Sequence, residues 1–221
     1  MRRICLGLVF MFVLAGFVRE ASASAITFNE AGLVPGYGPS PYYGGAQKGT
    51  LIGNQFASQG VLFTMSGPGA AYVSSAPFTG ATDPSLIGNY LAFNTTPYTS
   101  KEWATLSARF VDPLSGTGTT ASGFSVTVSD GNVDAVRSRV LAFDIYGNQL
   151  EAFTLTSLAN TFQFTSSNIA RIDFVDTGGD GHVIDNFKFT LNPTSVPEPA
   201  SLTLLATGGT VLAFVRRRRR Q

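Results

Sequence analysis

The chain has 221 residues, a formal net charge of +1 and only 13% charged residues. Apolar residues make up 44%, which excludes a highly charged, disordered chain, and the 24 glycines follow no three-residue period, which excludes a collagen-like protein. The single cysteine cannot pair within the chain, so a disulfide-stabilised scaffold is excluded as well.

The first 25 residues have the pattern of a secretory signal peptide. Two arginines precede a short apolar run over residues 4–18, and alternating alanines and serines follow it. A signal peptidase needs small side chains two positions apart, so it could cut after Ala23 or after Ala25, and we favour Ala25. A retained membrane anchor is the alternative, but the apolar run is short for a span. Cys5 would leave with the peptide.

Residues 26–195 are long enough to form one domain with a substantial core. This body holds 7 lysines and arginines against 12 aspartates and glutamates, a net charge of −5, so the basic excess lies in the two ends of the chain. A mildly acidic body without a basic patch argues against a nucleic-acid partner.

The body reads as β-structure. Apolar residues alternate with polar ones in several short runs, which is typical of half-buried strands. The alternating or apolar sets are Val61–Phe63, Tyr90–Phe93, Phe124/Val126/Val128, Leu141/Phe143/Ile145, Phe153/Leu155, Phe162/Phe164, Ile172/Phe174 and Phe187/Phe189/Leu191. Turn residues separate them, and no helical period is long enough for a core helix. The sequence therefore predicts an all-β, antiparallel β-sandwich or jelly roll.

Two carboxylates fall on apolar faces if the flanking segments are continuous strands. Residues two apart share a face, so Glu30 would lie with Ile26 and Phe28, and Asp185 with Val183 and Phe187. A buried carboxylate needs a partner, and a Ca²⁺ ion would satisfy both. The alternative is that the two side chains cap turns or accept hydrogen bonds from backbone amides.

The segments 26–30 and 184–189 resemble the ends of lectin-like and carbohydrate-binding jelly-roll modules. That resemblance implies a structural Ca²⁺, for which Glu30 and Asp185 are the candidate ligands. Asp180, in the glycine-rich turn before the last predicted strand, is a further candidate. No other cofactor is expected.

Catalytic chemistry has little support in the sequence. His182 is the only histidine and follows a glycine-rich turn, so we interpret it as a solvated loop residue. Neither a nucleophile-elbow motif nor a phosphate-binding loop occurs. Aromatic rings in polar or loop-like surroundings are candidates for stacking on sugars, and the favoured alternative is that they pin loops to the sandwich; these rings are Tyr42, Tyr43 and Trp103.

The C-terminal segment 196–221 has three parts in order. Pro197, Glu198 and Pro199 come first, an uncharged apolar run over residues 200–215 follows, and arginines close the chain, among them Arg216, Arg217 and Arg218. As a helix the run would span about 24 Å, close to a bilayer span, with the arginines on the cytoplasmic side.

This arrangement resembles the PEP-CTERM sorting signal of Gram-negative bacteria. The resemblance implies processing by an exosortase at the inner membrane, where the tail resides transiently, and delivery to the cell surface or extracellular matrix. An ordinary tail anchor is the alternative. We therefore expect a secreted, non-catalytic surface or matrix protein with exopolysaccharide as a candidate ligand; the alternatives are an extracellular enzyme acting on glycans and a purely structural or adhesive protein.

Overall fold

The computed structural model describes residues 22–36, 48–67, 70–75, 88–94, 104–130, 138–156, 159–176 and 182–193. Apart from one short 3-10 helix, every regular element in these ranges is a strand. The elements are β1 (Ser22–Ile26), η2 (Ala57–Gln59), β2 (Val61–Ser66), β3 (Ala70–Ser75), β4 (Asn89–Asn94), β5 (Ala104–Phe110), β6 (Ala121–Asp130), β7 (Arg139–Phe143), β8 (Gln149–Thr154), β9 (Ala159–Gln163), β10 (Arg171–Asp176) and β11 (His182–Leu191).

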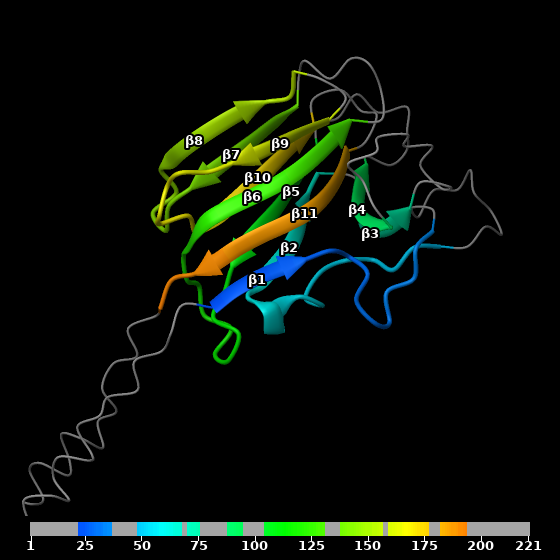
Figure 1. The fold of residues 1–221 in the computed structure, drawn as a ribbon, viewed down its shortest axis with the longest axis horizontal. Helices are drawn as coiled ribbons and strands as arrows, with labels where there is room; N and C mark the ends of the chain where they lie inside the picture. The colour runs from blue at the N-terminus through cyan, green and yellow to red at the C-terminus, as the bar shows by residue number, and fades with distance from the viewer. Residues whose placement is uncertain are drawn as a thin grey trace, which may run out of the picture.

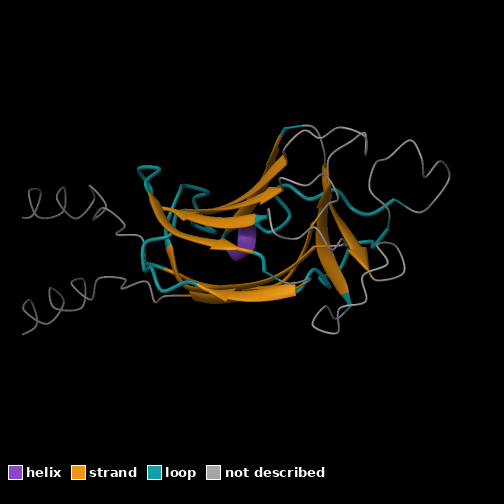
Figure 2. Cartoon of the chain, turned by 90° about the horizontal axis from the view of Figure 1, so that it is seen from above, coloured by secondary structure: helices purple, strands orange, loops and turns teal. Residues whose placement is uncertain are grey.

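The strands form two sheets that pack face to face (Figures 1 and 2). One sheet has the order β3-β4-β11-β6-β9, with β1 also paired to β11, and the other has the order β2-β5-β10-β7-β8. All of these pairs are antiparallel. The predicted all-β, antiparallel sandwich is confirmed, and each of the predicted apolar runs contributes to a strand or borders one.

The first and last strands are neighbours. Residue Ser22 of β1 pairs with Leu191 of β11, and Ile26 pairs with Phe187. The chain therefore enters and leaves the sandwich at the same end (Figure 1). Strand β1 includes four residues that a cut after Ala25 would remove. The position of the cut and the start of the domain stay predictions.

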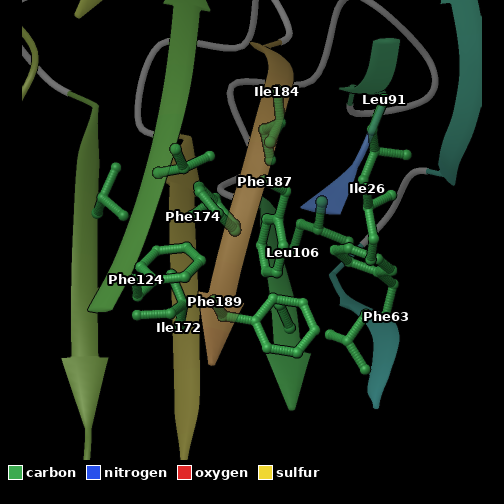
Figure 3. Packing of buried hydrophobic residues seen from close by; sticks show 14 of the residues in the cluster. Ile26, Phe63, Leu91, Leu106, Phe124, Ile172, Phe174, Ile184, Phe187 and Phe189 are labelled. Atoms are coloured by element: carbon green, nitrogen blue, oxygen red, sulfur yellow. The ribbon is translucent and has the colours of Figure 1, made fainter. Parts of the chain in front are cut away.

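Phenylalanines fill the space between the sheets (Figure 3). The ring of Phe187 is fully buried at the centre of this core. Its centroid lies 4.8 Å from that of Phe124, 5.5 Å from that of Phe63 and 5.7 Å from that of Phe189, in edge-to-face geometry. Such pairs add to the free energy gained by burying the rings, so this cluster is the main apolar link between the two sheets.

In β7 the face that packs against the core is the opposite of the one that the sequence predicts. Alternation favoured Leu141, Phe143 and Ile145 as the inward set, but Ile145 is 62% exposed, while Val140 and Ala142 are fully buried. The reason is register: Val140 pairs with Phe174 and Ala142 with Ile172, which are the core-facing residues of β10. The Phe143 ring instead packs under the guanidinium group of Arg171, 4.3 Å from the ring centroid.

A further segment extends the six-stranded sheet beyond β3. The Ile52 amide donates to the Ala71 carbonyl and the Val73 amide donates to the Thr50 carbonyl, each at 2.9 Å. Gly49 lies so close to this edge that a Cβ placed on it would stand 2.1 Å from the Val73 carbonyl oxygen. Only glycine permits the approach that the structure shows at this position.

Glu151 joins the two sheets at the β8–β9 edge. Its Oε1 accepts hydrogen bonds from the backbone amides of Thr165, at 2.9 Å, and Ser166, at 2.6 Å. Partial burial raises the pKa of this carboxyl group, but the hydrogen bonds from Ser166 and Thr165 together outweigh it, so the pKa lies below the ordinary value of 4.5.

We expect the Glu151→Gln variant to lose a pH-dependent part of the stability. Because the folded pKa is lowered, the carboxylate stabilises the protein above its unfolded pKa, and this contribution is lost as the pH falls through the folded pKa. The group is solvent-screened, so the effect should be below about 1 kcal/mol. Urea unfolding of the wild type and of the variant between pH 3 and pH 7 measures this effect. A difference in the free energy of unfolding that stays constant across this range would contradict the lowered pKa of Glu151.

In the described ranges, no helix is long and apolar enough to cross a membrane. The predicted signal peptide before Ser22, the apolar tail and the aromatic candidates Tyr42, Tyr43 and Trp103 lie outside the described residues, as does Asp180.

Candidate functional site

A junction of three chain segments lies along one edge of β11. On that edge β4 pairs with His182–Ile184, and β1 pairs from Phe187 onward. Between these two partners lie Asp185 and Asn186. The loop that leaves β1 contains Glu30. We define the junction as residues 27–30, 88–89 and 185–186.

The backbone at this junction is unusual. In the described ranges only two non-glycine residues have a positive φ, Phe28 at 59° and Asn186 at 52°, and both lie here. Gly88, at 79°, adds a third left-handed residue. Such conformations cost free energy for residues with a side chain, and they collect where the surroundings hold the chain in a fixed shape.

The side chain of Asn29 connects two of the segments. The Asn29 side chain donates to the Thr27 carbonyl at 2.9 Å, and its Oδ1 accepts from the Asn89 amide at 3.1 Å. The loop after β1 is thereby fastened to the start of β4. Sequence reasoning did not single out Asn29, Asn89 or Asn186; the tolerance of asparagine for positive φ is the only local signal for any of them.

The two carboxylates reach the junction by a different route from the one predicted. Strand β1 ends at Ile26, and Glu30 lies in the following loop, where Phe28 is buried as the alternation predicts and Glu30 is half-buried. In β11 an irregularity lies between Asp185 and Lys188, and Ile184 and Phe187 both face the core. Asp185 therefore points away from the side of the sheet that carries the core, although its side chain is only 2% exposed.

Each carboxylate accepts a backbone hydrogen bond. The Asn186 amide donates to Asp185 Oδ1 at 2.6 Å, and the Thr27 amide donates to Glu30 Oε1 at 3.3 Å. Glu30 Oε2 is buried and has no hydrogen-bond partner among the described residues. These contacts agree with the alternative of carboxylates that accept backbone hydrogen bonds, at Asp185 Oδ1 and at Glu30 Oε1.

The oxygen-rich character of the junction fits a hard cation such as Ca²⁺ in ligand type. No group of three or more histidine, cysteine, aspartate and glutamate side chains in the described part of the chain is close enough to hold a metal ion. A cation here would therefore rely on the two carboxylates and on backbone carbonyls.

His182 is buried, and its interpretation as a solvated loop residue is wrong. It begins β11, is 3% exposed and stacks on Phe93 with the ring centroids 5.3 Å apart. Its Nε2 forms a hydrogen bond with the hydroxyl group of Ser138, which is buried as well. Pairing with β4 draws the residue inside, because His182 lies opposite the core residue Phe93. A side chain so enclosed serves packing, not surface chemistry.

Beyond the sandwich, residues 195–220 match the family model described as the PEP-CTERM protein-sorting motif. The chain carries a PEP-CTERM sorting motif. The predicted resemblance is confirmed over the proline–glutamate–proline, apolar and arginine parts of the tail. The PEP-CTERM motif indicates export and sorting to the cell surface or the extracellular space of a Gram-negative bacterium.

The sandwich is similar to several solved carbohydrate-binding modules. A CBM29-2 mutant complexed with cellulohexaose is 12% identical, with a TM-score of 0.41, and the alignment covers 77% of this chain and 91% of that one. The CBM22-1 xylan-binding domain of Paenibacillus barcinonensis Xyn10C is 13% identical, with a TM-score of 0.32, covering 60% and 87%.

The enzymatically active domain of bacteriophage CBA120 tailspike protein 4 also matches. It is 12% identical, with a TM-score of 0.37, and the match covers 63% of this chain but only 20% of the tailspike chain. No curated protein matches this chain.

Proposed function

We propose that the chain is a non-catalytic protein of the cell surface or extracellular matrix whose tail is cut by an exosortase-type enzyme at the inner membrane. The match of residues 195–220 to the sorting motif carries this proposal. In the precursor the apolar run 200–215 holds the tail in the membrane, the arginines stay on the cytoplasmic side, and the sandwich lies outside.

Replacing Pro197, Glu198 and Pro199 by alanines tests this proposal. We expect the full-length tail to be retained and the protein to accumulate in the inner-membrane fraction, because the processing enzyme no longer recognises its site. Mass spectrometry of cell fractions measures the change. The matched control is Tyr146→Ala, an 87% exposed residue in the β7–β8 turn, which should be processed normally. Equal processing of both variants would contradict the proposal.

We also propose that the junction binds Ca²⁺ through Glu30 and Asp185. The buried, unpartnered Glu30 Oε2 and the enclosed Asp185 carboxylate support this assignment. A bound ion would stabilise the folded state by about 2.7 kcal/mol at a concentration one hundred times its dissociation constant. We expect a chelator to lower the melting temperature of the wild type.

In the Asp185→Asn variant the melting temperature should no longer respond to chelator. Asp144→Asn is the control, because Asp144 is a half-buried carboxylate that accepts amide hydrogen bonds in the β7–β8 turn, far along the chain from the junction. A wild-type melting temperature that chelator leaves unchanged would exclude the calcium site.

Exopolysaccharide is the proposed ligand of the sandwich, with Tyr42, Tyr43 and Trp103 as stacking candidates. Flat aromatic rings on loops suit the apolar faces of sugars, and loops on a rigid sandwich are frequent binding surfaces. Glycan-array binding by the exported protein, with and without chelator, tests this ligand class; no retained glycan would favour a structural or adhesive role.

A further inference from the structure

We infer that the exported protein begins at Ser24, because the signal peptidase cuts between Ala23 and Ser24 and not after Ala25. This inference rests on the proposed export of the chain. The sequence offers both sites, since small residues stand two apart at 21 and 23 and again at 23 and 25. The structure distinguishes them, because residues that one cut would remove belong to the folded sandwich.

Strand β1 protects the edge of β11. Five register pairs join the two strands, from Ser22 with Leu191 to Ile26 with Phe187. A cut after Ala25 removes four of them, whereas a cut after Ala23 removes two. No other strand pairs with this edge of β11 from Phe187 to Leu191 in the described part of the chain, so the earlier cut leaves fewer backbone groups of β11 without a partner.

The new amino group is the second consideration. A cut after Ala25 would place a charged α-ammonium on Ile26, a residue with 0% exposure in the middle of the core. Loss of the preceding residues would uncover one side of that nitrogen, but it would remain in the sheet on a core residue that pairs with the fully buried Phe187. Placing a charge beside apolar groups is unfavourable unless it is paired.

Ser24 is a better first residue. It is only half-buried, and both of its neighbours along β1, Ala23 and Ala25, are exposed. Its hydroxyl group donates a hydrogen bond to the Gln59 carbonyl at 3.2 Å, which fastens the start of the chain to η2. In the cut, water adds across the Ala23–Ser24 peptide bond, giving a carboxylate on Ala23 and an ammonium group on Ser24.

Two matched variants separate the sites in the full-length chain expressed in a Gram-negative host. Ala21→Leu spoils only the cut after Ala23, and Ala25→Leu spoils only the cut after Ala25. Because Ala25 is exposed on β1, leucine there should be tolerated by the fold. The readout is the N-terminal sequence and mass of the exported protein, together with the amount of uncut precursor.

We expect the wild type and Ala25→Leu to begin at Ser24, and Ala21→Leu to accumulate precursor at least about tenfold. A wild type that begins at Ile26, or a block in Ala25→Leu with normal cutting in Ala21→Leu, would overturn the inference while leaving export intact. An uncut wild-type chain in the cytoplasm would overturn both the inference and the proposed export.

Discussion

Alanine in place of Phe187 is expected to lower the free energy of unfolding by about 3–5 kcal/mol. The ring is fully buried, and five other phenylalanine rings have centroids within 6.5 Å of its own. Four of these five come from strands other than β11, so the cavity opens where the two sheets meet (Figure 3). A loss of this size is a large part of the total stability of a single domain.

Denaturant unfolding of the variant measures this loss. Phe187→Leu should retain most of the stability, because leucine keeps much of the apolar volume. Tyr146→Ala, at an 87% exposed position, should change stability by less than about 0.5 kcal/mol. If Phe187→Ala unfolded at nearly the same denaturant concentration as Tyr146→Ala, the position of Phe187 in the core would be refuted.

Alanine in place of Gly49 is expected to detach the segment 48–52 from β3 and to cost about 1–3 kcal/mol or more. The added Cβ would stand 2.1 Å from the Val73 carbonyl oxygen, a backbone atom that cannot rotate away. The same oxygen accepts a hydrogen bond from the Gly36 amide at 3.2 Å, so its displacement also disturbs the chain before the segment.

Hydrogen exchange at the Val73 and Ile52 amides reports this change directly, because both donate across this edge. Gly118→Ala is the matched control, since nothing lies within 4 Å of a Cβ at that position. That control should be neutral or slightly stabilising. Unchanged protection of Val73 in Gly49→Ala would show that the segment does not pack as the structure has it.

The strands could be predicted because apolar and polar residues alternate within each run, independently of the strands beside it. The pattern of Phe124, Val126 and Val128 needs no knowledge of its neighbours, and these residues line the core face of β6. In β7 both faces are apolar, so alternation alone could not choose between them. The pairing of Ala142 with the core residue Ile172 decides which face of β7 is buried.

The calcium site of Glu30 and Asp185 stays a prediction. In the structure Asp185 lies within β11, and Glu30 lies in the loop that follows β1, the strand that pairs with β11. The orientation of Asp185 could not be predicted, because the three steps of β11 from Asp185 to Lys188 lie opposite only two steps of β6, from Thr127 to Ser125. Such a bulge exists only once two strands pair, and it reverses the alternation beyond it.

By itself the sequence determined the class of the fold and the sorting tail, since alternation, turn residues and the order of the tail motif are local properties of the chain. Only the tertiary structure decided which carboxylates are enclosed, that His182 is buried, and that residues 22–25 belong to the sandwich. The physical reason is that burial and strand pairing depend on residues far apart in the chain, which meet only when β1 and β11 lie side by side.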